Sequence, residues 1–364
     1  MSPVLRLAGP VLVGPDDERG PAWVVDGRIT YDRPTGSAGS GSAVETIEGW
    51  VLPGLVDAHC HIGLGPHGAV DNATSERQAL DERAAGALLL RDAGSPADTR
   101  WVQEREDLPR LVRAGRHLAR PRRYLRGFAH EIEPDQLASF VTQEARSGDG
   151  WVKLVGDWID REVGDLAPCW PRWALEDAMA AAHEHGARVT AHCFGEECLT
   201  DLVEAGIDCI EHGTGLTADT IPLLADRGVP IVPTLVNIAS FPSIAEAAQA
   251  RFPAYADRMR ALHARRHDTV AQAHDAGIPV FVGTDAGGSL AHGLVAAEVA
   301  ELRTSGLTAV DALDAACWSA RRWLGWPGLD EGDAADLVVY PADPRVDPAV
   351  LAHPRAVVLR GVVR

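Results

Sequence analysis

The sequence lacks the features of a membrane or secreted protein. No segment approaches the roughly 18 uninterrupted apolar residues that a membrane helix needs. The N-terminal segment has no basic stretch followed by a long apolar one, which a signal peptide would show. The six cysteines are irregularly spaced and include no CxxC pair, so they do not indicate a disulfide framework. We therefore expect a cytoplasmic protein with free thiols.

Positive charge is also scarce. The chain has 34 Lys and Arg against 52 Asp and Glu, which gives a net charge of −18. Nucleic acids and anionic membrane surfaces are polyanions, so this balance disfavours both as partners. The net charge says little about a small molecule, because the charges inside the binding pocket decide how it binds. We therefore expect a small-molecule substrate as the partner. The sequence leaves open whether the chain forms a homo-oligomer.

Length and patterning predict two domains. A chain of 364 residues is longer than one ordinary core requires, which favours a large domain and a smaller one. Residues 1–50 contain short alternating apolar segments broken by Gly, Pro and Asp, with a flexible loop at 34–43, and strand-like text returns near the end. We predict that 1–50 and 326–364 form a composite β-sandwich domain around a second domain at 51–325.

The central region alternates short apolar runs with helical stretches such as 172–186 and 197–206. Eight strand-then-helix units within residues 51–325 are typical of an α/β fold of the (β/α)8 TIM-barrel class. A doubly wound open sheet is the alternative, with ligands at a single switch point. The predicted strands are 51–61, 87–94, 124–130, 151–156, 187–193, 207–213, 229–235 and 278–287.

His59 and His61 stand two residues apart at the end of the first predicted barrel strand. The two-residue period of a strand places both imidazoles on one face, while Cys60 points the other way. Two converging nitrogens suit a divalent metal such as zinc. Taken alone, this spacing is more often a chance pair in a turn.

Three more metal-binding side chains end other predicted strands. His192 ends the fifth, His212 the sixth and Asp285 the eighth. In a barrel these ends gather at the carboxyl-terminal face, where active sites lie. Unpaired buried polar groups cost on the order of 2–7 kcal/mol, and a metal would satisfy several at once.

Lys153 lies in the middle of the apolar run WVKLV. A lysine buried in a barrel is costly unless it is paired or chemically used. A structural ion pair, for example with Asp157, and a functional role are both compatible with this position.

The motifs LPGLVDAHCHIG, WVKLVGD, VTAHCFG, IEHGTG, GTDAGG and GDAADLVVY together resemble the amidohydrolase superfamily. The most similar branch is the imidazolonepropionase-like and prolidase-like group, which acts on amides and dipeptides. The resemblance implies two divalent metal ions, most simply Zn2+, and a Lys153 carboxylated by carbon dioxide that bridges them. The metal ligands that it implies are His59, His61, Lys153, His192, His212 and Asp285.

The resemblance implies hydrolysis by a metal-activated hydroxide, with Asp285 carrying its proton to the leaving amine. We predict cleavage of a C–N bond, amide or peptide, in an N-acyl amino acid, dipeptide or cyclic amide. The same site could hydrolyse a lactone, carbamate or phosphotriester. A deaminase with one metal is another alternative, but Glu196 stands four residues after His192, where deaminases of this superfamily have a glutamate three residues on. The last alternative is a barrel that binds a ligand without catalysing a reaction.

Substrate contacts are harder to place. His130 and His292 follow the third and eighth predicted strands and are candidates for binding a substrate anion such as a carboxylate. A helix-facing or capped histidine is an equal alternative for His130, and His292 could instead orient a neighbouring ligand. Trp158 or Trp170 could form a wall of the pocket, although most tryptophans of this region are expected to pack.

Overall fold

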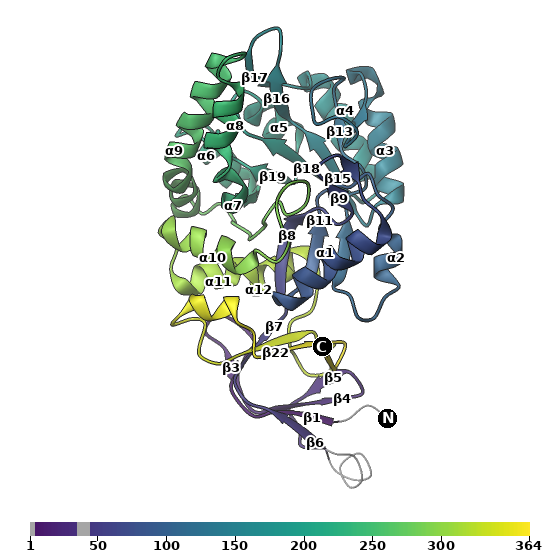
Figure 1. The fold of residues 1–364 in the computed structure, drawn as a ribbon, viewed down its shortest axis with the longest axis vertical. Coiled ribbons are helices and arrows are strands. Elements are labelled where there is room, and N and C mark those ends of the chain that lie inside the picture. Colours follow the sequence, from purple (N-terminus) through teal and green to yellow (C-terminus); the bar gives the residue numbers. More distant parts are fainter. Residues whose placement is uncertain (1–3, 35–43) are drawn as a thin grey trace.

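The computed structural model describes residues 4–34 and 44–364, so all but Pro34 of the predicted loop at 34–43 lies outside the described residues. The chain has the mixed α/β content that the sequence predicts. Helices surround a set of parallel strands, and β-sheets from both chain ends lie together at one end of the molecule (Figure 1).

Strands from the two chain ends form two sheets. One has the order β5-β4-β1-β6, and the other β23-β22-β21-β7-β2-β3. In the second sheet Trp50 pairs with Tyr340, so segments from opposite ends of the chain lie side by side. The strands are β1 (Val4–Leu7), β2 (Val11–Leu12), β3 (Glu18–Arg19), β4 (Ala22–Val25), β5 (Arg28–Thr30), β6 (Val44–Ile47), β7 (Trp50–Pro53), β21 (Leu337–Tyr340), β22 (Ala356–Leu359) and β23 (Val362–Val363).

The two sheets share one apolar core. Leu5 and Val24 of the first sheet and Leu337 and Val358 of the second are almost completely buried in one cluster. The alternation of apolar and polar residues explains this, since it gives each strand one apolar face. The predicted boundaries of this composite domain, at residues 50 and 326, stay a prediction.

The parallel strands follow one another in a cycle. The order β12-β11-β8 continues through the Cys60–Ala286 and Val280–Ile231 bridges into β20-β19-β18-β15-β13, and β12 and β13 belong to one segment, 110–119. This is the strand order expected of a (β/α)8 barrel. The strands are β8 (Leu55–Cys60), β11 (Ala87–Asp92), β12 (Arg110–Arg113), β13 (Leu118–Ala119), β15 (Trp151–Val155), β18 (Arg188–Cys193), β19 (Cys209–His212) and β20 (Ile231–Val232).

Helices connect and cover these strands, and none of the helices in the described part of the chain is long and apolar enough to cross a membrane. Asp71 caps the first helix by accepting from Thr74 N, and Gly206 ends the fifth in a left-handed conformation. The helices are α1 (Asn72–Ala84), α2 (Arg100–Gln103), α3 (Leu137–Ser147), α4 (Arg172–Glu184), α5 (Leu199–Ala205), α6 (Thr220–Arg227), α7 (Leu235–Ile238), α8 (Phe241–Ala248), α9 (Pro253–Asp275), α10 (Val295–Thr304), α11 (Ala309–Ala316) and α12 (Trp318–Leu324).

The short elements lie in the connections. The hairpin of β16 and β17 follows β15 directly and lies at the end of the molecule farthest from the terminal sheets (Figure 1). The bounds are β9 (Leu64–Gly65), β10 (Gly68–Ala69), β14 (His130–Glu131), β16 (Asp157–Asp160), β17 (Asp165–Pro168), η1 (Pro134–Gln136) and η2 (Pro348–Ala352).

The prediction of the third barrel strand at 124–130 is wrong. That segment contains turns and the left-handed Gly127, and only His130 at its end belongs to a strand. The third position is filled by 110–119, where Leu111, Val112 and Leu118 are buried. The arginines between these apolar residues concealed the alternating pattern, whereas the aromatic residues of 124–130 imitated it.

The amino-terminal end of the strand ring is filled by aromatic side chains. Trp323 of α12 stacks on Phe281 with ring centres 4.4 Å apart and lies 5.1 Å from the ring of Trp151. Farther along the strands come the buried charged residues Arg91, Lys153 and Glu211. The interior of the ring is therefore apolar at one end and polar at the other.

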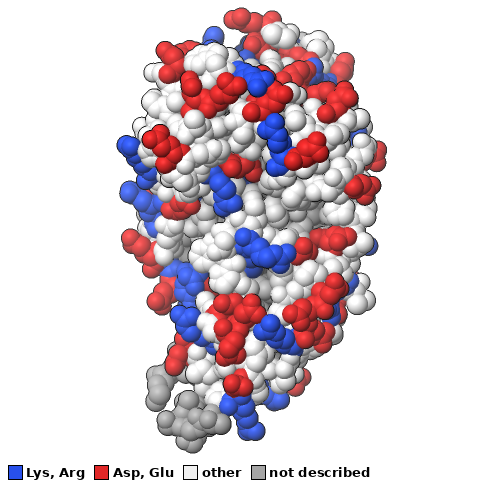
Figure 2. Space-filling model, turned by 180° about the vertical axis from the view of Figure 1, so that it is seen from behind, with Lys and Arg blue, Asp and Glu red and all other residues white. Residues whose placement is uncertain are grey.

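The outer surface carries charges of both signs. On the face turned away from Figure 1, acidic and basic side chains are interspersed (Figure 2). The negative net charge of the chain is therefore not gathered in a single region of this face.

Candidate metal centre

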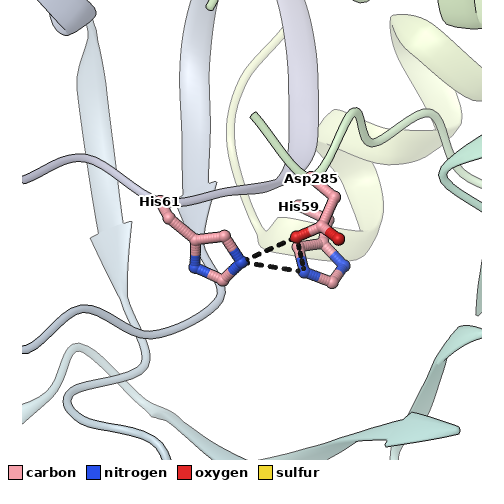
Figure 3. A group of neighbouring side chains, drawn as sticks. All are labelled: His59, His61 and Asp285. Carbon is pink, nitrogen blue, oxygen red and sulfur yellow. Dashed lines mark hydrogen bonds and ion pairs between the residues drawn. The ribbon is translucent and has the colours of Figure 1, made fainter. Parts of the chain in front are cut away.

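His59, His61 and Asp285 bring three ligand atoms together. His59 Nε2 lies 3.2 Å from His61 Nε2, and Asp285 Oδ1 lies 3.1 Å from the first and 2.8 Å from the second. The three side chains point toward one another from the ends of β8 and of the segment after Val280 (Figure 3). Burial alone would raise the pKa of Asp285, but His59, His61 and His212 hold it well below its usual value. The group can therefore present an ionised carboxylate to a cation.

Buried hydrogen bonds hold this group in place. Asp57 accepts from His59 N and Thr284 N at 3.0 Å and from Thr284 Oγ1 at 2.5 Å. Asp285 N donates to His59 O at 2.6 Å. These bonds connect β8 to the last strand position, so His59 and Asp285 keep a fixed separation.

Positive φ angles occur where the last strands end. His212, Thr234 and Asp285 have φ angles of 66°, 50° and 59°. Residues other than Gly rarely adopt this conformation, which costs on the order of 1–3 kcal/mol at each position. The three residues follow three consecutive strand positions, and the left-handed backbone turns each side chain at the carboxyl-terminal edge. The hydrogen bonds around these residues compensate the backbone strain.

His192 and His212 lie beside the first group. Their ring centres are 4.6 Å apart, and His212 is 5.1 Å from His59. Thr234 Oγ1 lies 2.7 Å from His212 Nδ1, whereas His192 Nε2 is buried without a hydrogen-bond partner. Burial and the neighbouring positive groups lower the pKa of both imidazoles well below the usual value. Both rings are therefore neutral near pH 7 and can offer a lone pair.

Lys153 is fully buried, and its Nζ has no hydrogen-bond partner. Asp157, the ion-pair partner considered from the sequence, instead accepts from the backbone N–H groups of Phe194 and Gly195. Burial lowers the pKa of Lys153, against the opposing effects of Glu211 and Asp285. Lys153 is also the only lysine in the chain, since the other 33 of the 34 basic residues are arginines.

These residues fit a divalent metal ion. Spacings of 2.8–3.2 Å among two imidazole nitrogens and one carboxylate oxygen are those of neighbouring ligands around one ion with bonds of about 2.0–2.2 Å. In the described part of the chain, His59, His61 and Asp285 form the one tight group of this kind. Lys153 and His192 are predicted ligands that lie outside this tight group. Lys153 Nζ and His192 Nε2 are buried without a hydrogen-bond partner.

Three residues near the site were not predicted from the sequence. His117 is fully buried, its two ring nitrogens have no partner, and its ring lies 5.2 Å from that of His61. Tyr124 lies 5.1 Å from His117, and Asn237 Nδ2 donates to Asp285 Oδ2 at 2.6 Å. The alternating text LVRAGRHLA could have indicated His117, whereas no sequence signal indicated Tyr124 or Asn237.

An aromatic wall, formed by Tyr124, Trp158 and Phe194, covers His192. Their ring centres lie 5.9, 5.2 and 4.1 Å from that of His192. Trp158 contacts Tyr124 edge to face at 4.8 Å and is only partly buried. By contrast, Trp170 is buried in the core and donates to Val155 O.

The two predicted substrate-binding histidines have partners elsewhere. His130 Nε2 lies 3.1 Å from Glu144 Oε1 of α3, and its ring packs beside Phe140. His292 Nδ1 lies 2.8 Å from Glu82 Oε1 of α1. The structure brings neither into the group around Asp285, because nearby helices supply carboxylates that bind them.

Comparison with known proteins gives concordant results. The amidohydrolase family model matches residues 138–363. An uncharacterized protein of Mycobacterium tuberculosis is 57% identical over 350 residues, covering 95% of this chain and 92% of that one. A 5-methylthioadenosine/S-adenosylhomocysteine deaminase of Halobacterium salinarum is 26% identical over 64% of this chain and 62% of its own length.

Solved structures show the same fold. The crystal structure of a Xaa-Pro dipeptidase with bound methionine matches with a TM-score of 0.81 at 20% identity, over 99% of both chains. The family match covers more than half of the sequence and includes the strands that carry Lys153, His192, His212 and Asp285. The chain therefore belongs to the amidohydrolase family and is a metal-dependent hydrolase of C–N bonds.

Proposed function

We propose that this enzyme is a binuclear hydrolase that cleaves an amide or peptide bond of a small molecule, at the carboxyl-terminal mouth of a (β/α)8 barrel. The carrying observation is the set of three ligand atoms 2.8–3.2 Å apart beside the unpartnered Lys153 Nζ. We assign one ion to His59, His61 and Asp285 and a second to His192 and His212. Zn2+ is the proposed metal, because imidazole and carboxylate ligands suit it.

Lys153 is proposed to be carboxylated. Its neutral amine would add to carbon dioxide with loss of one proton, forming an N–C bond and a carbamate. The buried amine would then carry a negatively charged carbamate able to bridge two ions. The absence of an ion pair at Lys153 supports this, because an unpaired ammonium in the interior is unfavourable.

Bound divalent ions would supply an acidified water and polarise the scissile carbonyl. The chain itself handles the proton. Asp285 Oδ1 faces the two histidine nitrogens, while Oδ2 is held by Asn237. A carboxylate fixed in this way can take a proton from water and return it to the leaving amine.

The aromatic wall supports a substrate with an apolar group next to the cleaved bond. Tyr124 and Trp158 offer flat ring faces and edges, and His117 behind Tyr124 adds unpartnered ring nitrogens that could bind a polar group. N-acyl amino acids and dipeptides combine these features. The fold shared with a Xaa-Pro dipeptidase agrees with this class.

A deaminase is the second candidate, because one relative is a nucleoside deaminase. Glu196 is exposed, however, and accepts a hydrogen bond from Thr217 Oγ1 at 3.1 Å. This hydrogen bond ties Glu196 to Thr217, which is not among the proposed metal ligands. Lactone, carbamate and phosphotriester hydrolysis use the same metal chemistry, so substrates of these classes are included in the test.

The test is a substrate screen with zinc-loaded protein. Panels of N-acyl amino acids, dipeptides and cyclic amides are compared with lactones, carbamates, phosphotriesters and 5-methylthioadenosine, and metal content is measured in parallel. We expect about two ions per chain and turnover confined to the first panels, absent in Asp285→Asn. Turnover of 5-methylthioadenosine alone, or full activity without metal, would overturn the proposal.

A further inference from the structure

Arg91 and Glu211 form a buried ion pair inside the strand ring. Both side chains are completely inaccessible to solvent, and Arg91 Nη2 lies 2.6 Å from Glu211 Oε1. Arg91 Nε donates to Ala58 O at 2.6 Å, which ties β11 to β8 next to His59. The guanidinium lies 4.6 Å from the ring of Trp151 and 5.0 Å from that of Trp323. The position of Arg91 is therefore fixed from several sides.

The two oxygens of Glu211 have separate partners. Oε1 accepts from Arg91 and from the Thr190 hydroxyl. Oε2 lies 2.6 Å from His59 Nδ1, and the opposite nitrogen of that ring, Nε2, faces His61 and Asp285. The ion pair with Arg91 and the hydrogen bond from the Thr190 hydroxyl occupy Oε1, which leaves Oε2 as the carboxylate oxygen that faces His59 Nδ1.

We infer that the Arg91–Glu211 pair sets the tautomer and orientation of His59. Glu211 keeps the imidazole proton on Nδ1, so that the Nε2 lone pair is directed at the metal position. Arg91 in turn fixes Glu211, which makes both of them positioning residues. This inference rests on the metal site of the proposed function.

The arrangement is more specific than an ion pair needs. An ion pair with Arg91 alone would be complete through Oε1, yet the second oxygen makes an ion-pair contact of 2.6 Å with Nδ1 of the imidazole that is proposed to bind the metal. Carboxylates in this position raise ligand basicity and fix the ring, and their loss typically costs 10–100-fold in metal affinity. The pair thereby connects the aromatic end of the barrel interior to the metal centre.

The first experiment needs no substitution at Glu211. In metal-free protein labelled with 15N-histidine, the long-range ring spectrum reports which nitrogen of His59 is protonated, with His59→Asn used to assign the signal. We expect the Nδ1–H tautomer. A dominant Nε2–H tautomer in the wild-type protein would overturn the inference, whatever the metal affinity.

The second experiment uses Glu211→Gln with Thr190→Val as its control. A glutamine whose carbonyl oxygen faces Arg91 and Thr190 must turn its amide N–H toward His59 Nδ1, which moves the ring proton to Nε2. We expect zinc affinity, measured by chelator competition, to fall roughly 10–100-fold. Thr190→Val removes the hydroxyl contacts with Glu211 Oε1 and Cys209 O but leaves Oε2 facing His59, so its zinc affinity should stay within about twofold of wild type.

The outcomes separate the two proposals. If wild-type protein binds no zinc, the proposed function fails, while the tautomer measurement still tests Glu211. If wild type binds zinc and Glu211→Gln binds it equally well, the positioning role fails and the metal site stands. If Glu211→Gln does not fold, the wild-type tautomer alone decides.

Discussion

The two halves of the proposed metal centre differ in how the protein satisfies their polar atoms. In the half built by β8 and the segment after Val280, His61 and Asp285 have hydrogen-bond partners within the protein, and His59 Nδ1 has an ion-pair contact of 2.6 Å with Glu211 Oε2. In the half built by β15 and β18, Lys153 Nζ and His192 Nε2 are buried without a hydrogen-bond partner, and the ion-pair contact of His192 Nε2 with Asp157 Oδ1 is long, at 3.9 Å. Leaving such a group unsatisfied costs about 1–3 kcal/mol. The first half is thus preorganised by the chain, whereas the second half would depend on the ion that is proposed to bind there.

The largest effect is expected from the preorganised half. Asp285→Asn keeps the size of the side chain and the contact with Asn237, but removes the negative charge and the proton acceptor. We expect kcat to fall roughly 10²–10⁴-fold with a much smaller change in KM, as measured by steady-state kinetics on the best substrate of the screen. A loss confined to KM would show that Asp285 binds substrate and does not move the proton.

Lys153 tests the dependent half. Lys153→Ala should retain about one zinc ion per chain, because the first group of ligands is intact, and should lose most activity. The chain has no other lysine, so wild-type protein equilibrated with 13C-bicarbonate should give one lysine carbamate signal that is absent from the variant. Two tightly bound ions in the variant, measured by elemental analysis, would contradict the division into halves.

Trp158 sharpens the comparison on the substrate side, because it covers His192 of the dependent half. Trp158→Ala removes partly buried apolar surface, so we expect KM to rise roughly tenfold for a bulky acyl group and to change little for acetyl. Trp173→Ala is the matched control, since Trp173 is 52% exposed on α4. Equal effects of the two variants would remove the aromatic wall from the recognition model.

The smallest effect concerns the support of the preorganised half. Glu298 accepts from Leu235 N and Val236 N and so holds α7, which carries Asn237. Burial raises the pKa of Glu298 to about 8, so the folded state binds this proton more tightly than the unfolded state. Relative to Glu298→Gln, wild type should therefore lose stability between about pH 4.5 and 8, and the two curves should run parallel above that. Denaturant unfolding across this range measures the difference; parallel curves throughout would contradict it.

The ligands could be proposed from the sequence because each ends an apolar run, and strand ends determine where they gather. The position of a residue in an apolar run did not, by contrast, indicate that Arg91 and Glu211 form a pair. Both lie in buried runs, as Lys153 does, and a charge inside such a run indicates a partner on another strand of the ring. Their pairing could not be inferred without the order of the strands.

Candidate substrate-binding residues were harder to choose from the sequence. His130 and His292 were chosen for their positions after strands, but the helices beside them provide Glu144 and Glu82. Tyr124 reaches the site only because Arg123 attaches its loop to the β16–β17 hairpin by donating to Trp158 O and Ala167 O. Contacts between loops of this kind leave no periodic pattern in the sequence.

The pairing of β7 with β21 has a consequence for how the chain folds. Trp50 lies opposite Tyr340, so an early strand can complete its sheet only after nearly the whole chain is available. Contacts so distant in sequence slow folding, because a long loop must close before they form. During synthesis the apolar face and one edge of β7 would stay unpaired while the central ring of strands forms, and an unpaired strand edge is prone to association. Folding of this enzyme in the cell should therefore be most vulnerable to aggregation before residues 337–363 emerge.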